Sequence, residues 1–207
     1  MSPFENDPCC YPGTDLLINL GDYRSQIDLN RFVADAVFLA FAAIEARPIK
    51  GPFDAARLKE THRRIFGKVY PWAGEFRKGI GMMGKNRSGF VVAYGPSENV
   101  PGALAEAFAK LKAERCLQGL DAGRFATRLA FNYSELDAIH PFREGNSRTL
   151  RAFTSDVAQA AGHRLEWSRV GQTTEDRQRL YHARDLAVMR GDTAELTAII
   201  SRALGAS

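Results

Sequence analysis

The stretch that decides the fold is His140–Arg151, HPFREGNSRTLR, because it separates two predicted helices. Apolar residues recur at helical spacing before it, from about residue 121 to residue 139. The HPF segment ends that pattern, and a new helical pattern runs from about residue 146 to residue 161. The sequence therefore predicts a loop between two helices that carries a histidine and a glutamate and runs into a helix with Arg148 and Arg151 on it.

Helical patterns also dominate the rest of the chain. They predict helices over residues 28–47, 54–66, 174–190 and 192–204, and one that begins near Ser97 and includes Leu111. The apolar residues of the helix over 28–47 cover a broad face, so this helix is predicted to be largely buried.

Glycine-rich sequence interrupts the helices once, between residues 67 and 95. Residues 77–83 and 90–94 are predicted to be short strands joined by GKNRSG, which gives a small β-hairpin that rests on the helical body. No repeat or linker divides the chain, and the first 26 residues are expected to pack on the domain as a lead-in segment. We therefore expect one all-α domain over residues 1–207, with a hairpin flap at about 77–94.

Composition indicates an ordinary soluble domain that can bury a core, with 45% apolar residues. The net charge of +4 is compatible with an anionic partner or with a solvated arginine-rich surface. The three cysteines, Cys9, Cys10 and Cys116, have no disulfide or zinc spacing, so we expect reduced thiols in a cytoplasmic protein. The N-terminal sequence does not resemble a secretion signal, and no apolar run is long enough to span a membrane.

The residue types of the stretch suit phosphate chemistry. The start of a helix at Gly145, Asn146 and Ser147 offers backbone N–H groups and the positive end of a helix dipole to an anion. Arg148 and Arg151 are three residues apart in a helix, so they share a face and could clamp the outer phosphates of a nucleotide.

The acid and the imidazole add two further functions. Beside polyphosphate, a carboxylate such as Glu144 usually holds Mg²⁺. His140 titrates near physiological pH and can accept a proton from an attacking hydroxyl. Taken singly, each residue has an ordinary structural interpretation, but their ordered combination favours a nucleotide site.

The stretch resembles the signature of the Fic family, H-P-F-x-[D/E]-G-N-x-R-x-x-R, and fills every specified position. The resemblance implies transfer of AMP from ATP to a protein hydroxyl, with His140 as general base and Glu144 as Mg²⁺ ligand. It further implies that Gly145 and Asn146 line the hole for the α- and β-phosphates, and that Arg148 and Arg151 hold the outer phosphates. Many members have glycine where this chain has Ser147, whose backbone N–H remains available and whose hydroxyl could touch phosphate.

In Fic enzymes a hairpin flap before the motif registers the target by strand addition. Lys85 and Phe90 are the expected target contacts in this chain, and YPWAGEFR (70–77) resembles the segment that leads into the flap. Tyr181 and His182 lie in a later helix that could approach the adenine.

The resemblance also suggests how the chain is controlled. Many members carry an inhibitory helix [S/T]-x-x-x-E-[G/N], but no glutamate of this chain has serine or threonine four residues before it. The chain thus resembles short bacterial Fic toxins that a separate small antitoxin silences by pairing a glutamate with the second motif arginine, here Arg151. That branch is associated with AMP addition to the type II topoisomerases, DNA gyrase and topoisomerase IV. No direct binding to nucleic acid is expected.

Two alternatives remain open on the sequence. The enzyme could use another nucleotide donor, because the residues that line the base cannot be identified from the sequence. Or the chain could be a non-catalytic binding module for DNA or protein whose basic charge is the active feature.

Overall fold

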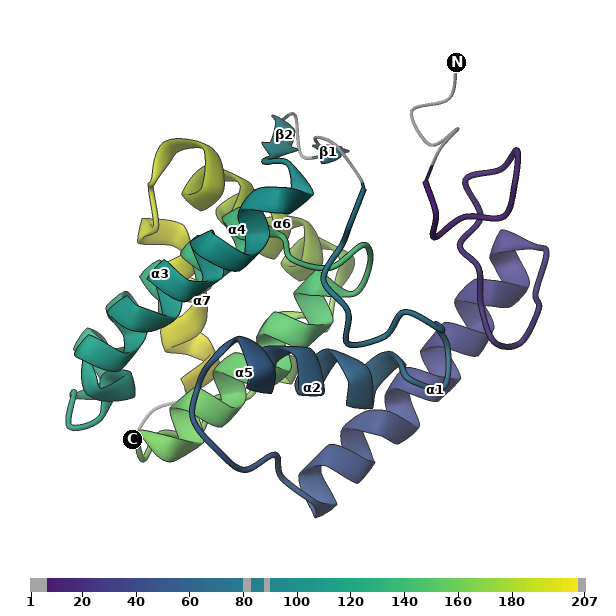
Figure 1. Ribbon diagram of the computed structural model, residues 1–207. Helices are drawn as coiled ribbons and strands as arrows, with labels where there is room; N and C mark the ends of the chain where they lie inside the picture. Colours follow the sequence, from purple (N-terminus) through teal and green to yellow (C-terminus); the bar gives the residue numbers. More distant parts are fainter. Residues whose placement is uncertain (1–6, 80–82, 88–89, 205–207) are drawn as a thin grey trace.

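The computed structural model describes residues 7–79, 83–87 and 90–204 (Figure 1). Over these residues the chain forms seven α-helices and one two-stranded antiparallel sheet, which confirms the predicted helical fold with a small hairpin. The helices are α1 (Gln26–Ala46), α2 (Ala55–Phe66), α3 (Val100–Ala113), α4 (Ala122–Ile139), α5 (Asn146–Ala160), α6 (Thr174–Arg190) and α7 (Ala194–Leu204). The strands are β1 (Met83–Arg87) and β2 (Phe90–Tyr94), and the short 3-10 turns are η1 (Ser97–Asn99), η2 (Arg115–Leu117) and η3 (Trp167–Val170).

Helix α4 lies at the centre of the main core, with α3, α5, α6 and α7 packed around it (Figure 1). Phe125 and Tyr133 of α4 belong to one buried cluster with Phe153 of α5 and Ile200 of α7. Because α4 is fixed on several sides, the loop that follows its last residue starts from a rigid position. Within the described ranges, none of the helices has the length and apolar character needed to cross a bilayer.

A second cluster joins α1 and α2, and it corrects the expected burial of α1. Val33 and Val37 of α1 pack with Ile65 of α2, but Phe38 is 76% exposed and Leu39 is 61% exposed. The prediction of a largely buried helix was wrong, because α1 lies at the edge of the molecule and buries one stripe only (Figure 1).

Most predicted helix ends are confirmed by capping contacts. The side chains of Asp54 and Asp121 accept the N–H groups that begin α2 and α4, and Thr173 forms a capping box at the start of α6. Three starts differ from the prediction: α1 begins at Gln26, Ser97 begins η1 rather than α3, and α7 begins at Ala194 rather than at residue 192.

The hairpin is present, but its first strand is shifted from the predicted position. Strand β1 pairs with β2 from Met83 opposite Tyr94 to Arg87 opposite Phe90, whereas residues 77–83 were predicted as the strand. GKNR was interpreted as part of a turn because of its composition, yet a hairpin of two strands accepts polar residues where a face is open to water. Residues 80–82 and 88–89 lie outside the described residues.

Gly145 shows a close approach that the motif requires. Its φ is +83°, in the left-handed region, and an added Cβ would lie 2.3 Å from Cε2 of Phe66. A side chain at this position would therefore strain the backbone and overlap a buried ring.

We expect Gly145→Ala to lower the free energy of unfolding by roughly 2–5 kcal/mol, since backbone strain and overpacking add. Gly162→Ala is the matched control, because Gly162 has a φ of +86° but nothing within 4 Å of the added Cβ. Urea unfolding of both variants measures the difference. Equal losses would show that the contact with Phe66 is unimportant.

Candidate active site

His140 ends α4 in a left-handed conformation, with φ 49° and ψ 61°. Left-handed geometry is uncommon for a residue other than glycine and is found where the surroundings impose it. Its N–H donates to the carbonyl of Leu136, and its own carbonyl accepts Nε–H of Arg77 at 2.8 Å. Hydrogen bonds to its N–H group and to its carbonyl therefore hold the backbone of His140 in place.

The imidazole of His140 is buried, with 1% of the residue exposed, and it stacks on the ring of Tyr94 at the end of β2. Burial lowers the pKa of His140 well below its ordinary value, and the nearby cation of Lys85 lowers it further. The ring is therefore neutral at physiological pH, which is the state that can accept a proton. Tyr94 is itself 1% exposed, so the two stacked rings are buried together.

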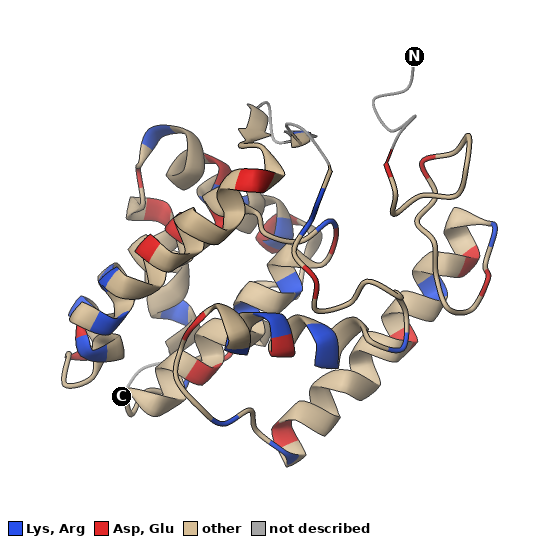
Figure 2. Cartoon of the chain, viewed as in Figure 1, with Lys and Arg blue, Asp and Glu red and all other residues tan. Residues whose placement is uncertain are grey.

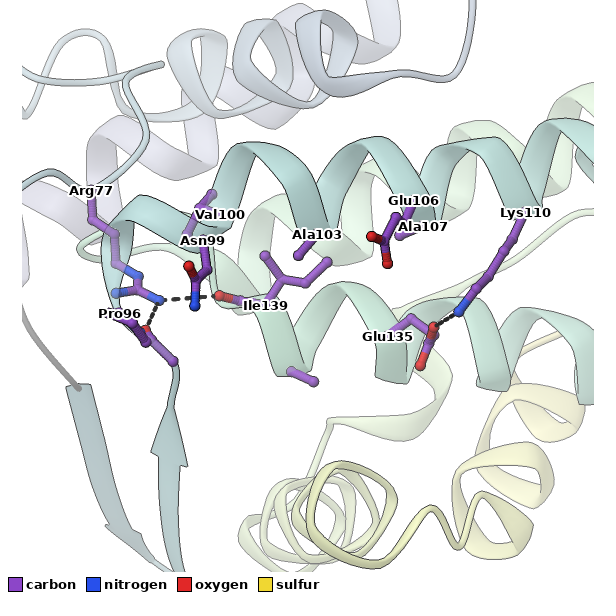
Figure 3. A pocket seen from close by; sticks show the side chains of 12 residues that line it. Arg77, Pro96, Asn99, Val100, Ala103, Glu106, Ala107, Lys110, Glu135 and Ile139 are labelled. Carbon is purple, nitrogen blue, oxygen red and sulfur yellow. Dashed lines mark hydrogen bonds and ion pairs between the residues drawn. The ribbon is translucent and has the colours of Figure 1, made fainter.

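Arg77 connects the flap to the motif loop. Its guanidinium donates to the carbonyls of Ile139, His140 and Gly95, and its backbone N–H donates to the carbonyl of Pro141. Figure 3 shows this side chain at one end of a groove of about 270 Å³ between α3 and α4. A cation at these carbonyls satisfies the C-terminal end of α4, where the helix leaves acceptors unpaired.

The side chain of His62 on α2 supports the motif loop by hydrogen bonds and by ring stacking. Its Nδ1 accepts the N–H of Gly74 at 2.8 Å, so its Nε2 carries the hydrogen and donates to the carbonyl of Glu144 at 3.0 Å. The ring also stacks on Phe142 with centroids 3.9 Å apart. Burial lowers the pKa of His62 to about 4, so this bridge consists of a neutral histidine.

Asn146 closes the loop on itself. Its side chain accepts the N–H of Phe142 at 2.9 Å and donates to the carbonyl of Phe142 at 2.7 Å. The side-chain amide of Asn146 is thus used within the loop. Its backbone N–H, at the start of α5, is left to bind another group. The N-cap residue of this helix is Gly145, which has no side chain that could accept an N–H group of the first turn. The first turn of α5 therefore presents N–H groups that the helix itself cannot satisfy.

Glu144 and Arg148 pair with each other. The Oε1 of Glu144 accepts the N–H of Gly145 at 2.8 Å and Nη2 of Arg148 at 2.9 Å. Within the described residues, no three His, Cys, Asp or Glu side chains converge on a possible metal position. One partly exposed carboxylate beside an open helix start nevertheless fits Mg²⁺, because this ion keeps several waters and needs few protein ligands.

The structure does not bring the two motif arginines into one cavity. Arg148 lines a cavity of about 320 Å³ together with Glu144 and Tyr70, and its guanidinium lies over the ring of Phe66. Arg151 instead lines a cavity of about 700 Å³ between α1, α5 and η3. Their shared helix face therefore does not fix a shared direction for two long side chains.

Arg151 is largely buried, and burial lowers its pKa. Its Nε has no hydrogen-bond acceptor among the described residues. A buried guanidinium with an unused donor is costly unless an anion completes it. Tyr181 of α6 lies near Arg151, whereas His182 lines a different cavity with other residues of α6 and with Glu195 of α7.

The flap and the lead-in segment also reach the site. Lys85 of β1 lies near Tyr94, with Nζ 6.0 Å from the ring centroid, and the side chain of Phe90 lies outside the described residues. In the lead-in segment, Asp7 forms a buried ion pair with Arg143 of the motif loop. Cys9, Cys10 and Cys116 are free thiols, and burial raises the pKa of Cys9 to about 11.

Four positioning residues were not identified from the sequence: His62, Arg77, Asp137 and Arg184. His62 had a detectable signal, because it shares helical spacing with Leu58 and with Ile65 on the buried face of α2. The other three are ionisable residues whose partners are distant in the sequence, and spacing carries no signal of such pairs.

These features define a helical domain in which an uncapped helix start follows a buried histidine. Residues 52–158 match the sequence profile of the Fic/DOC family, and the chain belongs to that family. The protein adenylyltransferase VbhT of Bartonella schoenbuchensis is 34% identical over 96% of this chain, which spans 39% of the length of VbhT. The probable protein adenylyltransferase y4lH of Sinorhizobium fredii is 34% identical over 79% of this chain and 81% of its own.

Solved structures agree with the fold. The N-terminal Fic domain of a Bartonella quintana effector protein, solved with bound ADP, superposes with a TM-score of 0.83 at 26% identity. The match covers 94% of this chain and 93% of that domain. The overall fold is thus that of a Fic domain.

The buried His62 predicts a loss of stability in acid. The unfolded histidine binds a proton near pH 6.5, whereas the folded one does so only near pH 4. Between these values the unfolded state holds more protons, so the free energy of unfolding falls as pH is lowered, by about 1.4 kcal/mol per pH unit. Urea unfolding of the parent and of His62→Gln measures this slope. Since His140 is present in both proteins, the parent should have the steeper slope, and parallel curves would contradict the assignment.

Proposed function

We propose that the chain is a protein adenylyltransferase, which moves AMP from ATP to a hydroxyl of a target protein. The names of the relatives VbhT and y4lH support this activity, and the ADP-bound Fic domain supports an adenine nucleotide as substrate. One observation carries the proposal. The neutral imidazole of His140 and the open first turn of α5 lie at the two ends of the short loop 141–145.

His140 acts as the general base in this proposal. Its imidazole takes the proton of the target hydroxyl, and the hydroxyl oxygen forms a bond to the α-phosphorus of ATP. The bond from that phosphorus to the oxygen that bridges to the β-phosphate breaks, and pyrophosphate leaves. Because Tyr94 covers the imidazole, the end of β2 must shift before the target hydroxyl arrives.

The start of α5 holds the phosphate chain. The N–H groups at Gly145, Asn146 and Ser147 surround the α- and β-phosphates, and Arg151 binds the γ-phosphate with its unused donor. Arg148 turns from Glu144 to a phosphate when the nucleotide binds. Glu144 is then free for Mg²⁺, which offsets the charge of the phosphate oxygens.

The flap receives the target. An extended segment adds to the β1–β2 hairpin by backbone hydrogen bonds, and Lys85 and Phe90 contact its side chains. Lys85 also lies close enough to lower the pKa of His140, so target docking and the charge state of the base are linked.

We further propose a toxin that acts in the cytoplasm and is silenced by a small antitoxin. Arg151 opens into the 700 Å³ cavity, which Phe41 of α1 also lines. Beyond it α1 has no charged residue between Asp35 and Glu45 and exposes Phe38 (Figure 2). An antitoxin helix with an apolar face and one glutamate fits this surface, because the glutamate would complete Arg151. DNA gyrase and topoisomerase IV are the proposed targets, on the basis of the family resemblance alone.

We expect His140→Ala to abolish AMP transfer while nucleotide binding persists, because the phosphate contacts come from α5 and its side chains. Labelling of a bacterial lysate with α-³²P-ATP, followed by mass spectrometry of labelled bands, measures transfer and identifies the target. Labelled gyrase or topoisomerase IV is the expected result, together with growth arrest by the parent and none by the variant. Undiminished labelling by the variant would exclude His140 as the base, and competition with other nucleotides tests the donor.

Arg151→Ala should weaken ATP binding by about tenfold or more and leave ADP binding nearly unchanged, since only ATP has a γ-phosphate. Calorimetry with both nucleotides gives the ratio, and ADP is the internal control. Equal losses for both nucleotides would place Arg151 elsewhere on the phosphate chain.

A further inference from the structure

A buried cluster beside the motif joins three helices through one arginine. Arg184 of α6 donates Nε–H and Nη2–H to the two carboxylate oxygens of Asp137 on α4, at 2.9 and 2.7 Å. Its Nη1 donates to Oγ of Ser147 on α5 at 3.0 Å. The side chains of Arg184 and Asp137 are 0% and 1% exposed. One guanidinium thus links the end of α4 with the start of α5.

The pair is better suited to setting geometry than to adding stability. Removing two charges from water costs about as much as their attraction returns, so a buried ion pair contributes little net free energy. Asp137 Oδ1 lies 3.9 Å from Nδ1 of the His140 imidazole, which is beyond hydrogen-bond distance. The specific result of the pair is the remaining bond, from Arg184 to Ser147.

That bond fixes the direction of the Ser147 side chain. Arginine has donors only, so Oγ of Ser147 is the acceptor and faces the buried guanidinium. Serine at a helix start otherwise tends to bond nearby backbone N–H groups with its hydroxyl. At Ser147 those groups are the ones proposed to hold phosphate, so a rotated side chain would compete with the nucleotide.

We infer that Arg184, held by Asp137, is a positioning residue that keeps the Ser147 side chain out of the phosphate site. The chain thereby accommodates serine where the Fic signature often has glycine, and the N–H groups of α5 stay open to a nucleoside triphosphate. This inference rests on the proposed nucleotide site and deepens it. It concerns binding of the phosphate chain, so it can be tested without measuring AMP transfer.

A double-mutant cycle tests the inference with four proteins: the parent, R184K, S147G and S147G/R184K. Lysine retains a positive charge for Asp137, but its single nitrogen lacks the planar fork by which arginine reaches Asp137 and Ser147 from separate nitrogens. We expect R184K to weaken binding of Mg²⁺-AMPPNP by about tenfold in the parent and by much less when S147G is also present. R179K on the exposed face of α6 is the control for an arginine-to-lysine change in this helix.

Rescue by S147G distinguishes positioning from a general structural role. Thermal unfolding of all four proteins is measured in parallel, and a structural role would give the same loss of affinity in both backgrounds, which overturns the inference. No loss in R184K overturns it as well, as does a parent that does not bind AMPPNP. A parent that binds AMPPNP but transfers no AMP to protein contradicts the proposed function and leaves the inference intact.

A crystal structure of the parent with AMPPNP gives a second test that does not depend on a variant that folds. The Ser147 hydroxyl should remain on the Arg184 guanidinium, with phosphate oxygens on the backbone N–H groups of α5. A Ser147 hydroxyl bonded to a phosphate oxygen would overturn the inference.

Discussion

The structure depends on which hydrogen-bond partners satisfy the backbone polar groups of the turn between α4 and α5. The end of α4 leaves carbonyls without partners, and the start of α5 leaves N–H groups without partners, in a loop that the core surrounds. Arg77 satisfies the carbonyls of Ile139 and His140, and His62 satisfies the carbonyl of Glu144. The acceptors are thus paired from outside while donors of α5 are left. A turn whose carbonyls are paired and whose N–H groups are open attracts an anion.

The groups that support the turn come from separate parts of the chain. His62 belongs to α2, Arg184 to α6 and Asp7 to the lead-in segment, and each reaches the loop or a helix beside it. The central position of α4 makes this convergence possible, because helices on several sides have access to its last turn. The site is therefore a property of the whole domain rather than of the motif alone.

The flap is mechanically connected to the catalytic loop at two points. Arg77 bonds the carbonyl of Gly95, which follows β2, and Tyr94 at the end of β2 stacks on His140. A displacement of the hairpin would thus act on the ring that stacks on the imidazole. Burial also lowers the pKa of His140, which keeps the imidazole neutral at physiological pH.

Local features of the fold could be predicted from the sequence, whereas long-range features could not. The helix starts after Asp54 and Asp121 and the break at the motif depend on residues within a few positions of one another, so pattern analysis found them. The start of β1 depends on pairing with β2, and the exposure of α1 depends on which neighbours the fold provides. The partners of Arg184 are 47 and 37 residues away, and no local pattern encodes such distances.

The ion pair between Asp7 and Arg143 bears on how the domain can be divided. The segment that identifies the family, 52–158, contains Arg143 and Asp137 but neither Asp7 nor Arg184. A fragment trimmed to those borders would keep Arg143 without Asp7 and Asp137 without Arg184. Each of these charges would then be buried without its counter-ion, which is costly. Chimeras between relatives therefore need to exchange the segments on both sides of residues 52–158 together with that range, because Asp7 and Arg184 lie outside it.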